Sequence, residues 1–361
     1  MGVGMRIRLE IWAAAIGLAV WTLSVILHHP SLDWAIYSDV ISFWHSKPGL
    51  RQGGVACVNY FLEYPPASCT IITAARILGG PSEIGYYMAF SLLSLPAYII
   101  LSISTLRLYP ENRSGAYPIL ASPSLIIYGI YNFDHFVAAF MALSLYLHLR
   151  GRVFLSTFFL GVAVAVKAIP ILLIHLYFGG GHVRMKALGL LLGLAPFTYP
   201  IILNPSYLVE FTQFHAGWGL ENAWYLWLVG DPFSSSAKVF GVWIGLILLI
   251  RAYLADLGFL QKSFLILSSW LLSSYVFTPQ MALMLVPLIP ASGKLIILWP
   301  VFEAANISII LTWFTTPTPT LPWTLPQTMA LARAAVLAGM FGLVYLMASR
   351  IQRFSSLRFG V

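Results

Sequence analysis

Two acids stand out in the segment that follows the first apolar stretch of the chain. Asp39 lies in Tyr-Ser-Asp-Val, and Glu63 lies in Leu-Glu-Tyr-Pro-Pro, where the prolines favour a rigid, extended backbone. The 361 residues include only twelve carboxylates, so an acid kept beside apolar segments is a candidate for function. Such a carboxylate can act as a general base that takes a proton from a hydroxyl group. The alternative is an ordinary loop acid: Asp39 on the polar face of an interfacial helix, and Glu63 as a structural residue.

A single lysine interrupts the apolar run from Gly161 to Pro170. A lysine in such surroundings either extends to the membrane interface or meets a fixed anion. Because Pro170 should break the helix there, we expect the Lys167 ammonium to reach the extracytoplasmic face. A phosphate group is one such anion, and a carboxylate of the protein itself, Asp134 or Glu221, is the other.

Three further segments carry polar side chains that can bind a substrate. His215 and Glu221 lie in a run of aromatic residues and glycines, which allow close approach of the backbone. Gln280 follows a proline between two apolar stretches, where non-helical backbone at membrane depth usually lines a cavity. Arg51 adds a cation to the segment between Asp39 and Glu63.

The composition shows which elements must position these residues. Hydrophobic residues make up 59% of the chain and charged residues 9%, against about 25% charged in soluble domains. This excludes a soluble protein and predicts an all-α, polytopic integral membrane protein with about 12 transmembrane helices. The clearest apolar stretches are 11–28, 84–105, 187–203, 236–255, 263–278, 295–314 and 327–349. Shorter or interrupted stretches are 65–79, 116–131, 133–149, 153–180 and 281–292. Of these, we expect 153–180 to form two short helices.

The net charge of +8 comes from short basic clusters that flank the apolar stretches. This distribution is typical of cytoplasmic loops, and it lacks the basic face with interleaved aromatic residues that a nucleic-acid-binding protein needs. The residues concerned are Arg6, Arg8, Arg150, Arg152, Arg184, Lys186, Arg350, Arg353 and Arg358.

With basic clusters at both ends, the large loops fall on the extracytoplasmic side. These are residues 29–64, which we expect to contain interfacial helices, and 204–235. We interpret residues 1–361 as one transmembrane domain whose two large loops form the functional site. The two cysteines, Cys57 and Cys69, lie at the end of the first loop, either as a disulfide or as two free thiols.

Four of these segments, in this order, resemble the GT-C glycosyltransferases. The segments are Asp39 with Glu63-Tyr64-Pro65-Pro66, the helix ending in Lys167-Ala168-Ile169-Pro170, the His215–Glu221 loop, and Thr278-Pro279-Gln280. They are most similar to the family 87 polyprenol-phosphate-mannose-dependent mannosyltransferases and to the catalytic subunits of glycosylphosphatidylinositol mannosyltransferases. The motifs are short, but together they extend over residues 37–290. Two positions depart from the family: Ala168 stands where proline is common, and Gly217-Trp218 where an arginine-containing stretch is expected.

The resemblance implies an enzyme that transfers a hexose, mannose in this family, from a polyprenyl-phosphate sugar to a lipid or glycan acceptor with inversion. It implies Asp39 as the catalytic base, and Glu63, Tyr64, Arg51, Lys167, His215, Glu221 and Gln280 as substrate-binding residues. Besides donor and acceptor, the partners are membrane lipids, with no nucleic acid. We expect no metal or other cofactor, since no Asp-x-Asp motif lies outside the apolar stretches. The short loops favour a prokaryotic plasma membrane with the active site on the extracytoplasmic face.

Two other classes fit the same composition. A secondary transporter or lipid flippase is also polytopic, but transporters usually have paired halves with broken helices at matching positions, and the sequence has no such repeat. A non-catalytic subunit of a membrane glycosylation complex is the third class. Asp39, Glu63 and Lys167 argue against it.

Overall fold

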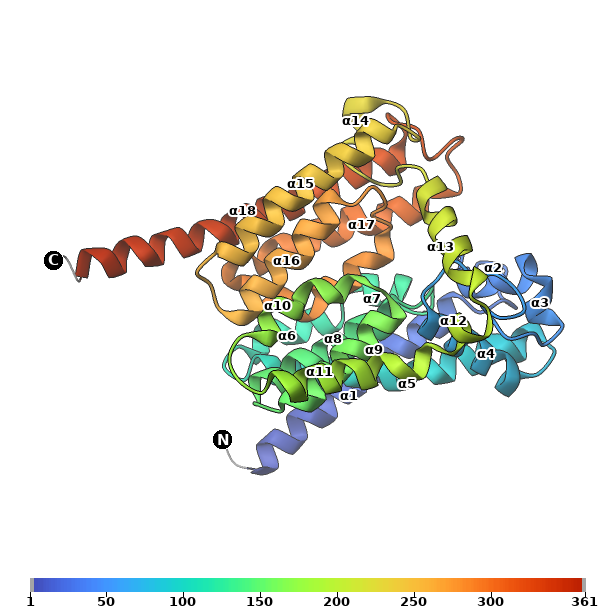
Figure 1. Cartoon of the computed structure of the whole chain (residues 1–361), viewed down its shortest axis with the longest axis horizontal. Helices are drawn as coiled ribbons and strands as arrows, with labels where there is room; N and C mark the ends of the chain where they lie inside the picture. The colour runs from blue at the N-terminus through green and yellow to red at the C-terminus, as the bar shows by residue number, and fades with distance from the viewer. Residues whose placement is uncertain (1–2, 359–361) are drawn as a thin grey trace. The chain divides into compact units, whose positions relative to one another are not determined.

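The long apolar stretches form helices, because in a bilayer every backbone N–H and C=O must be satisfied within the segment itself. The computed structural model describes residues 3–358, and within this part the only β-structure is two isolated bridges (Figure 1). The expected all-α, polytopic integral membrane architecture is confirmed. By packing, the chain divides into two compact units, Met1–Gly217 and Trp218–Val361.

The first unit begins with the long helix α1 and ends with α13, which follows the short elements η2 and α12. Its helices are α1 (Val3–Leu27), α2 (Asp39–Ser46), α3 (Pro48–Arg51), α4 (Pro66–Gly79), α5 (Glu83–Leu108), α6 (Arg113–Leu120), α7 (Pro123–Tyr128), α8 (Asp134–Leu149), α9 (Val153–Val166), η1 (Ile169–Leu173), α10 (Ile174–Phe178), α11 (Val183–Leu194), η2 (Ala195–Phe197), α12 (Tyr199–Leu203) and α13 (Ser206–Gly217).

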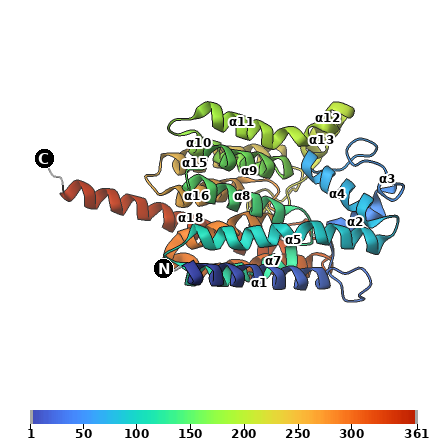
Figure 2. The same ribbon diagram turned by 90° about the horizontal axis from the view of Figure 1, so that it is seen from below.

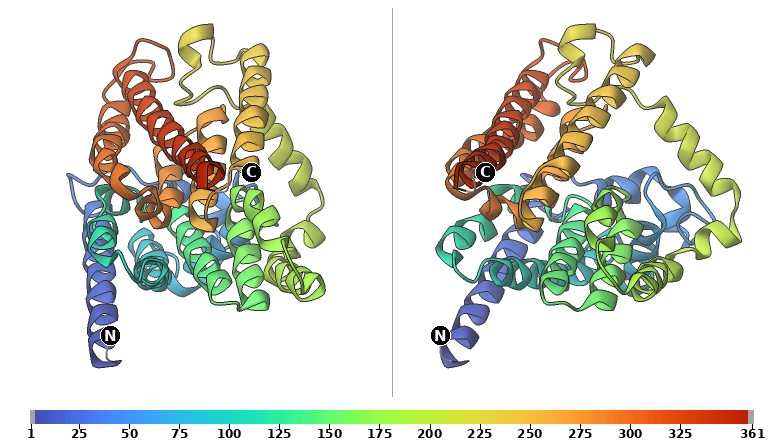
Figure 3. Two further views of the ribbon diagram at one scale, coloured as in Figure 1. Left: turned by 90° about the vertical axis from the view of Figure 1, so that its left-hand side faces the viewer. Right: turned by 60° about the vertical axis from the view of Figure 1, so that its left-hand side comes forward.

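The second unit is built from fewer and longer helices. They are α14 (Leu226–Val229), α15 (Ser235–Leu254), α16 (Phe259–Ser273), η3 (Pro279–Leu298), α17 (Trp299–Trp313) and α18 (Leu325–Arg358). In this unit α17 packs beside α18, and α16 contacts α15, η3 and α18 (Figure 3).

Five helices of the described part are long and apolar enough to cross a membrane. They are Arg8–Leu27, Glu83–Leu108, Ser235–Leu254, Pro279–Trp313 and Leu325–Met347. The remaining predicted spans correspond to shorter helices. As expected, 153–180 forms two of them: α9 (Val153–Val166) and the helix Ile169–Phe178, which consists of η1 and α10. The predicted span 187–203 is broken at η2, where Pro196 removes a helical N–H. The side chains of Arg6, Arg350, Arg353 and Arg358, used to predict topology, lie outside the described residues.

In the first unit, α1, α5, α8, α9 and α11 lie side by side in that order (Figure 2). Two glycines of α11 allow the last pair to approach closely. A Cβ atom on Gly193 would lie 2.1 Å from the carbonyl oxygen of Phe158, and one on Gly189 would lie 2.4 Å from that of Phe154. Small residues spaced four apart let the backbones of two membrane helices approach closely. Such packing matters in a bilayer, since lipid supplies no hydrophobic force that would drive helices together.

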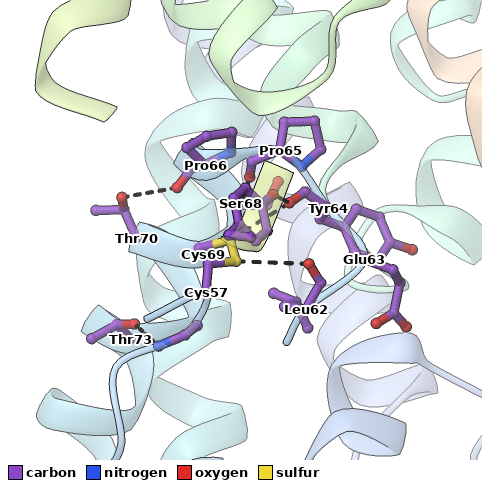
Figure 4. Close-up of a disulfide and its surroundings, with 12 residues drawn as sticks. Cys57, Leu62, Glu63, Tyr64, Pro65, Pro66, Ser68, Cys69, Thr70 and Thr73 are labelled. Atoms are coloured by element: carbon purple, nitrogen blue, oxygen red, sulfur yellow. Dashed lines mark hydrogen bonds between the residues drawn. A yellow bond between two sulfur atoms is a disulfide. The ribbon is translucent and has the colours of Figure 1, made fainter. Parts of the chain in front are cut away.

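The first loop is closed by a disulfide between Cys57 and Cys69, so the two cysteines are bridged rather than free (Figure 4). Their Cα atoms lie 6.0 Å apart, within the usual range for such a bridge. The bridge encloses the Glu63-Tyr64-Pro65-Pro66 segment and fixes it at the beginning of α4. On one side of it, the Thr73 hydroxyl accepts a hydrogen bond from the Ala56 amide (3.0 Å).

The close contact between α9 and α11 makes opposite predictions for two helical glycines. Gly193→Ala should lower stability by about 1–3 kcal/mol, because the added methyl group overlaps a backbone oxygen that cannot rotate away. Gly339→Ala in α18 meets no atom within 4 Å, so it should raise stability by up to about 1 kcal/mol through helix propensity. Thermal unfolding of the two purified variants in the same detergent measures both effects. Equal melting temperatures would show that α9 and α11 do not pack through Gly193.

Candidate active site

Asp39 is the first residue of α2, and its backbone is tied to the segment between α7 and α8. The Ser38 hydroxyl accepts a hydrogen bond from the Val40 amide (3.2 Å) and so caps the helix. The Asp39 amide donates to the carbonyl of Tyr131 (2.9 Å), and the Ser38 hydroxyl donates to that of Ile130 (3.0 Å). Segments about ninety positions apart are thereby held in register.

The Asp39 carboxylate accepts hydrogen bonds from two side chains at a single oxygen. The Tyr64 hydroxyl donates to Oδ2 at 2.8 Å, and the Asn132 side-chain amide donates to the same atom at 3.1 Å. The amide nitrogen of Asn132 also lies 3.2 Å from the Tyr64 hydroxyl oxygen. Tyr37, from the loop before α2, contributes a third hydrogen bond to Asp39.

These surroundings place the titration of Asp39 near neutral pH. Burial raises the pKa of its carboxyl to about 6, while the hydrogen bonds from Asn132, Tyr64 and Tyr37 oppose the increase and the Glu63 charge adds to it. Burial and the Asp39 charge also raise the pKa of the Tyr64 hydroxyl well above its usual value, so Tyr64 stays a donor. A base with a pKa near the working pH suits proton transfer from a hydroxyl group.

Asn132 connects Asp39 to a second acid. Its Oδ1 atom accepts a hydrogen bond from the Asp134 amide (3.1 Å), at the beginning of α8. The Asp134 Oδ1 atom lies 2.7 Å from the Lys167 ammonium, and the two side chains are 1% and 14% exposed. Of the two anions weighed for Lys167, the structure shows the protein's own carboxylate, Asp134. The other oxygen, Oδ2, is buried without a hydrogen-bond partner among the described residues.

Lys167 occupies the break between α9 and η1. Its backbone is extended (φ −155°, ψ 127°), so the helix ends at Val166 and the side chain leaves the apolar run there. The ammonium donates one of its three hydrogens to Asp134. Its partial exposure leaves room for another acceptor.

Two other predicted residues lie in the same loop without a hydrogen bond to Asp39 in the described structure. Glu63 forms an ion pair with Lys47 (2.8 Å), whose ammonium lies 5.6 Å from the centre of the Phe61 ring. Arg51 is exposed, and its guanidinium donates to the carbonyl of His45 (3.1 Å).

The beginning of the second loop packs against the first. The Tyr207 hydroxyl of α13 donates a hydrogen bond to the backbone carbonyl of Tyr64. The side-chain amide of Asn204 donates to the backbone carbonyl of Cys57 (3.2 Å). His215 lies at the end of α13, where its Nδ1 atom is 2.8 Å from the carbonyl oxygen of Phe211. The structure therefore joins the two loops up to residue 217, with Tyr64 at the contact.

Glu221 and Gln280 belong to the second unit, and their roles as site residues stay predictions. The Glu221 amide donates to the Tyr275 carbonyl (2.8 Å), and its own carbonyl accepts from the Phe277 amide (2.9 Å). The Glu221 carboxylate accepts from the Trp218 indole (2.9 Å). Gln280 is the second residue of η3 and is 5% exposed.

Sequence reasoning missed Asn132 and Lys47. The signal for Asn132 was present, since an Asn two positions before an Asp, at the boundary of two apolar stretches, is typical of a helix N-terminus. Lys47 had no comparable signal, because a lysine before Pro-Gly in a loop is usually solvated.

No protein-family model and no curated protein matches the chain. Among solved structures, the chain is similar to the crystal structure of ArnT from Cupriavidus metallidurans bound to undecaprenyl phosphate. The identity is 15% and the TM-score 0.45, with 92% of this chain and 76% of that chain covered. Likeness at this level decides nothing about the reaction, which has to be inferred from the residues themselves.

The buried ion pair predicts a rescue between two variants. Lys167→Met should destabilise the protein by about 3–5 kcal/mol, because it leaves the Asp134 carboxylate buried without a counter-charge. Adding Asp134→Asn removes that charge and should restore most of the melting temperature. Thermal unfolding of the single and double variants measures the effect. If the double variant is no more stable than Lys167→Met, the two side chains are not coupled.

Proposed function

We propose that this protein is a glycosyltransferase that moves a sugar from a polyprenyl-phosphate donor to a hydroxyl acceptor at the membrane surface. The observation that carries the proposal is the connection of a carboxylate near neutral pKa, Asp39, to a partly exposed ammonium, Lys167, through Asn132 and Asp134. The membrane-embedded helices around them suit a substrate whose lipid tail stays in the bilayer. The order of motifs resembling the GT-C enzymes supports the same class.

The reaction proceeds in one displacement. Asp39 takes the proton of the acceptor hydroxyl as its oxygen attacks the anomeric carbon of the sugar. The bond between that carbon and the phosphate oxygen breaks, and polyprenyl phosphate leaves with the bonding electrons. One carboxylate is enough for this inverting path, since the leaving phosphate needs no proton from a general acid.

Lys167 stabilises the leaving group. The donor is a phosphodiester with one negative charge, and the released phosphate monoester carries a further charge that develops during the reaction. A positioned ammonium interacts more strongly with that developing charge than with the ground state, which is the condition for lowering the barrier. In the absence of substrate, Asp134 occupies one ammonium hydrogen and holds the side chain in place.

Mannose is the sugar that the family resemblance implies, and the acceptor is a lipid or glycan with a free hydroxyl group. Tyr64 bonds Asp39 directly, and Glu63, through Lys47, holds the neighbouring part of the loop. Arg51 and His215 are proposed to contact the substrates from the first unit. Glu221 and Gln280 are proposed as further substrate-binding residues on the basis of the family resemblance.

The disulfide supports a position on the extracytoplasmic face. Disulfides persist in oxidising compartments and are rare where thiols are kept reduced. The Cys57–Cys69 bridge closes the same loop that holds Glu63 and Tyr64, which supports the extracytoplasmic face for the proposed site. A prokaryotic plasma membrane is the compartment we propose.

Replacing the base tests the proposal. The purified protein is assayed with radiolabelled polyprenyl-phosphate-mannose and a crude lipid and glycan extract. Asp39→Asn should lower transfer by at least about a hundredfold, since the amide cannot take the proton. Asp33→Asn, an exposed acid of the same loop, is the matched control and should keep full activity. Transfer should also persist in EDTA, because we propose that no metal takes part.

Each other outcome is informative. Transfer that survives Asp39→Asn with unchanged folding would move the base to Glu63 or Glu221. A wild-type protein that transfers no sugar from any polyprenyl phosphate would overturn the proposal and favour a transporter or an accessory subunit.

The pKa of Asp39 predicts the pH dependence of transfer. Only the ionised carboxylate accepts a proton, so the rate should be constant above the pKa of about 6. Below it the rate should fall about tenfold for each pH unit as the carboxyl becomes protonated. Initial rates at saturating donor between pH 4.5 and 8.5 give the midpoint. A midpoint near 4, as for an ordinary aspartate, would show that Asp39 is not desolvated or is not the base.

A further inference from the structure

The Asn132 side chain forms hydrogen bonds both to Asp39 and to the backbone of Asp134, the partner of Lys167. It is fully buried between Tyr131 and Phe133. Its amide nitrogen donates toward Asp39 Oδ2 and the Tyr64 hydroxyl, and its Oδ1 atom accepts from the Asp134 amide. The amide nitrogen and the acceptor oxygen of the side chain are therefore both in use.

Three side chains donate to the Asp39 carboxylate. Asn132 and Tyr64 both donate to Oδ2, and Tyr37 is the third donor. A carboxylate held by donors from three segments keeps a fixed plane and presents its remaining lone pairs in a defined direction. Proton transfer requires this, since the base must lie within hydrogen-bond reach of the hydroxyl in a defined orientation.

We propose that Asn132 is a positioning residue for the reaction: it holds Asp39 by Oδ2 so that the carboxylate meets the acceptor hydroxyl in one orientation, and it fixes this orientation relative to the Asp134–Lys167 pair. The inference rests on the glycosyltransferase function proposed above and deepens it. The proton moves from the acceptor hydroxyl to the Asp39 carboxylate, and it passes to solvent after the product leaves. Asn132 itself neither gains nor loses a proton.

The neighbours of Asp39 fix the sign of the effect. Tyr37, from its own loop, and Tyr64, from the disulfide-closed loop, are neutral donors, and Glu63 is the nearby negative charge. Asn132 donates to the Asp39 carboxylate and so favours its ionised form. Replacing its donor hydrogens by a carboxylate therefore shifts the equilibrium toward the protonated acid, which raises the pH needed for activity.

Asn132→Asp separates positioning from a purely structural role. The substitution keeps a side-chain oxygen that can accept from the Asp134 amide, as Asp and Asn both do in local hydrogen bonds to the backbone. It removes both donor hydrogens and places a second carboxylate beside Asp39. A role confined to holding the Asp134 amide would be preserved in Asn132→Asp and lost in Asn132→Ala.

The matched control is Asn59→Asp. Asn59 is exposed, lies in the disulfide-closed loop, and uses its Oδ1 atom to accept from the Val55 amide (2.8 Å). That bond survives the same chemical change, far from the hydrogen bonds of Asp39. It should leave the melting temperature and the pH profile of transfer unchanged.

Two measurements on the full-length variants decide the inference. In the first, the midpoint of the pH–rate profile should move upward by at least about one unit in Asn132→Asp, so that transfer is reduced far more at pH 6.5 than at pH 8.5. In the second, infrared difference spectroscopy follows the protonated-carboxyl band of Asp39 without substrate, with Asp39→Asn as the reference. The band should titrate near pH 6 in the wild type and at least about one unit higher in the variant.

The infrared measurement distinguishes a failure of the proposed glycosyltransferase function from a failure of the positioning role of Asn132. If the wild type transfers no sugar but the Asp39 band moves in Asn132→Asp, the glycosyltransferase function fails while the contact with Asn132 stands. If the wild type is active and Asn132→Asp leaves both midpoints unchanged, the positioning role is overturned. A loss of activity in Asn132→Ala alone, with Asn132→Asp unaffected, would also overturn it and confine the role of Asn132 to holding the Asp134 amide.

Discussion

A carboxylate enclosed by apolar helices must be neutralised, and Asp134 meets this requirement through the Lys167 ammonium 2.7 Å away. Leaving either charge alone at that depth would cost several kcal/mol. The pair therefore constrains the backbone around it: α8 has to begin at Asp134, and α9 has to end at Val166, so that the side chains meet. The break that brings Lys167 to Asp134 also makes the cation partly accessible.

The polar residues of the first unit form a connected series rather than a set of separate contacts. Tyr64 and Asn132 bind Asp39, Asn132 binds the Asp134 backbone, and Asp134 binds Lys167. Each member is held by a neighbour whose own position is fixed, which is what a preorganised site needs, since reorganisation at the moment of reaction raises the barrier. The disulfide and α13 hold the Tyr64 segment from the outside.

The second unit also contains a buried cation that is held by hydrogen bonds. Arg333 of α18 is fully buried, and its guanidinium donates to Asn306 of α17 (2.8 Å) and to the carbonyls of Asn222 and Phe277. It also lies over the Phe277 ring, 3.6 Å from its centre. These contacts join the segments that precede Gln280 and follow Glu221, so the two motifs belong to one rigid element of that unit.

The sequence by itself determined the environment of the chain and the location of its acids. Its apolar stretches are long enough for a bilayer, which requires helices, and Pro170 marks the end of a helix near Lys167 because proline lacks the N–H. The two loops and the positions of Asp39, Glu63 and Lys167 follow from the composition and from the places where the apolar stretches are interrupted.

Only the tertiary structure decided which of these residues act together. Asn132 and Asp39 are 93 positions apart, and no local pattern reports a contact across five intervening helices, α3 to α7. The same holds for the partner of Lys167 and for the bridge between Cys57 and Cys69, where the sequence allowed more than one solution. Contacts between distant segments depend on how helices pack, through features such as the Gly189 and Gly193 approach, and packing is a property of the whole fold rather than of any one segment.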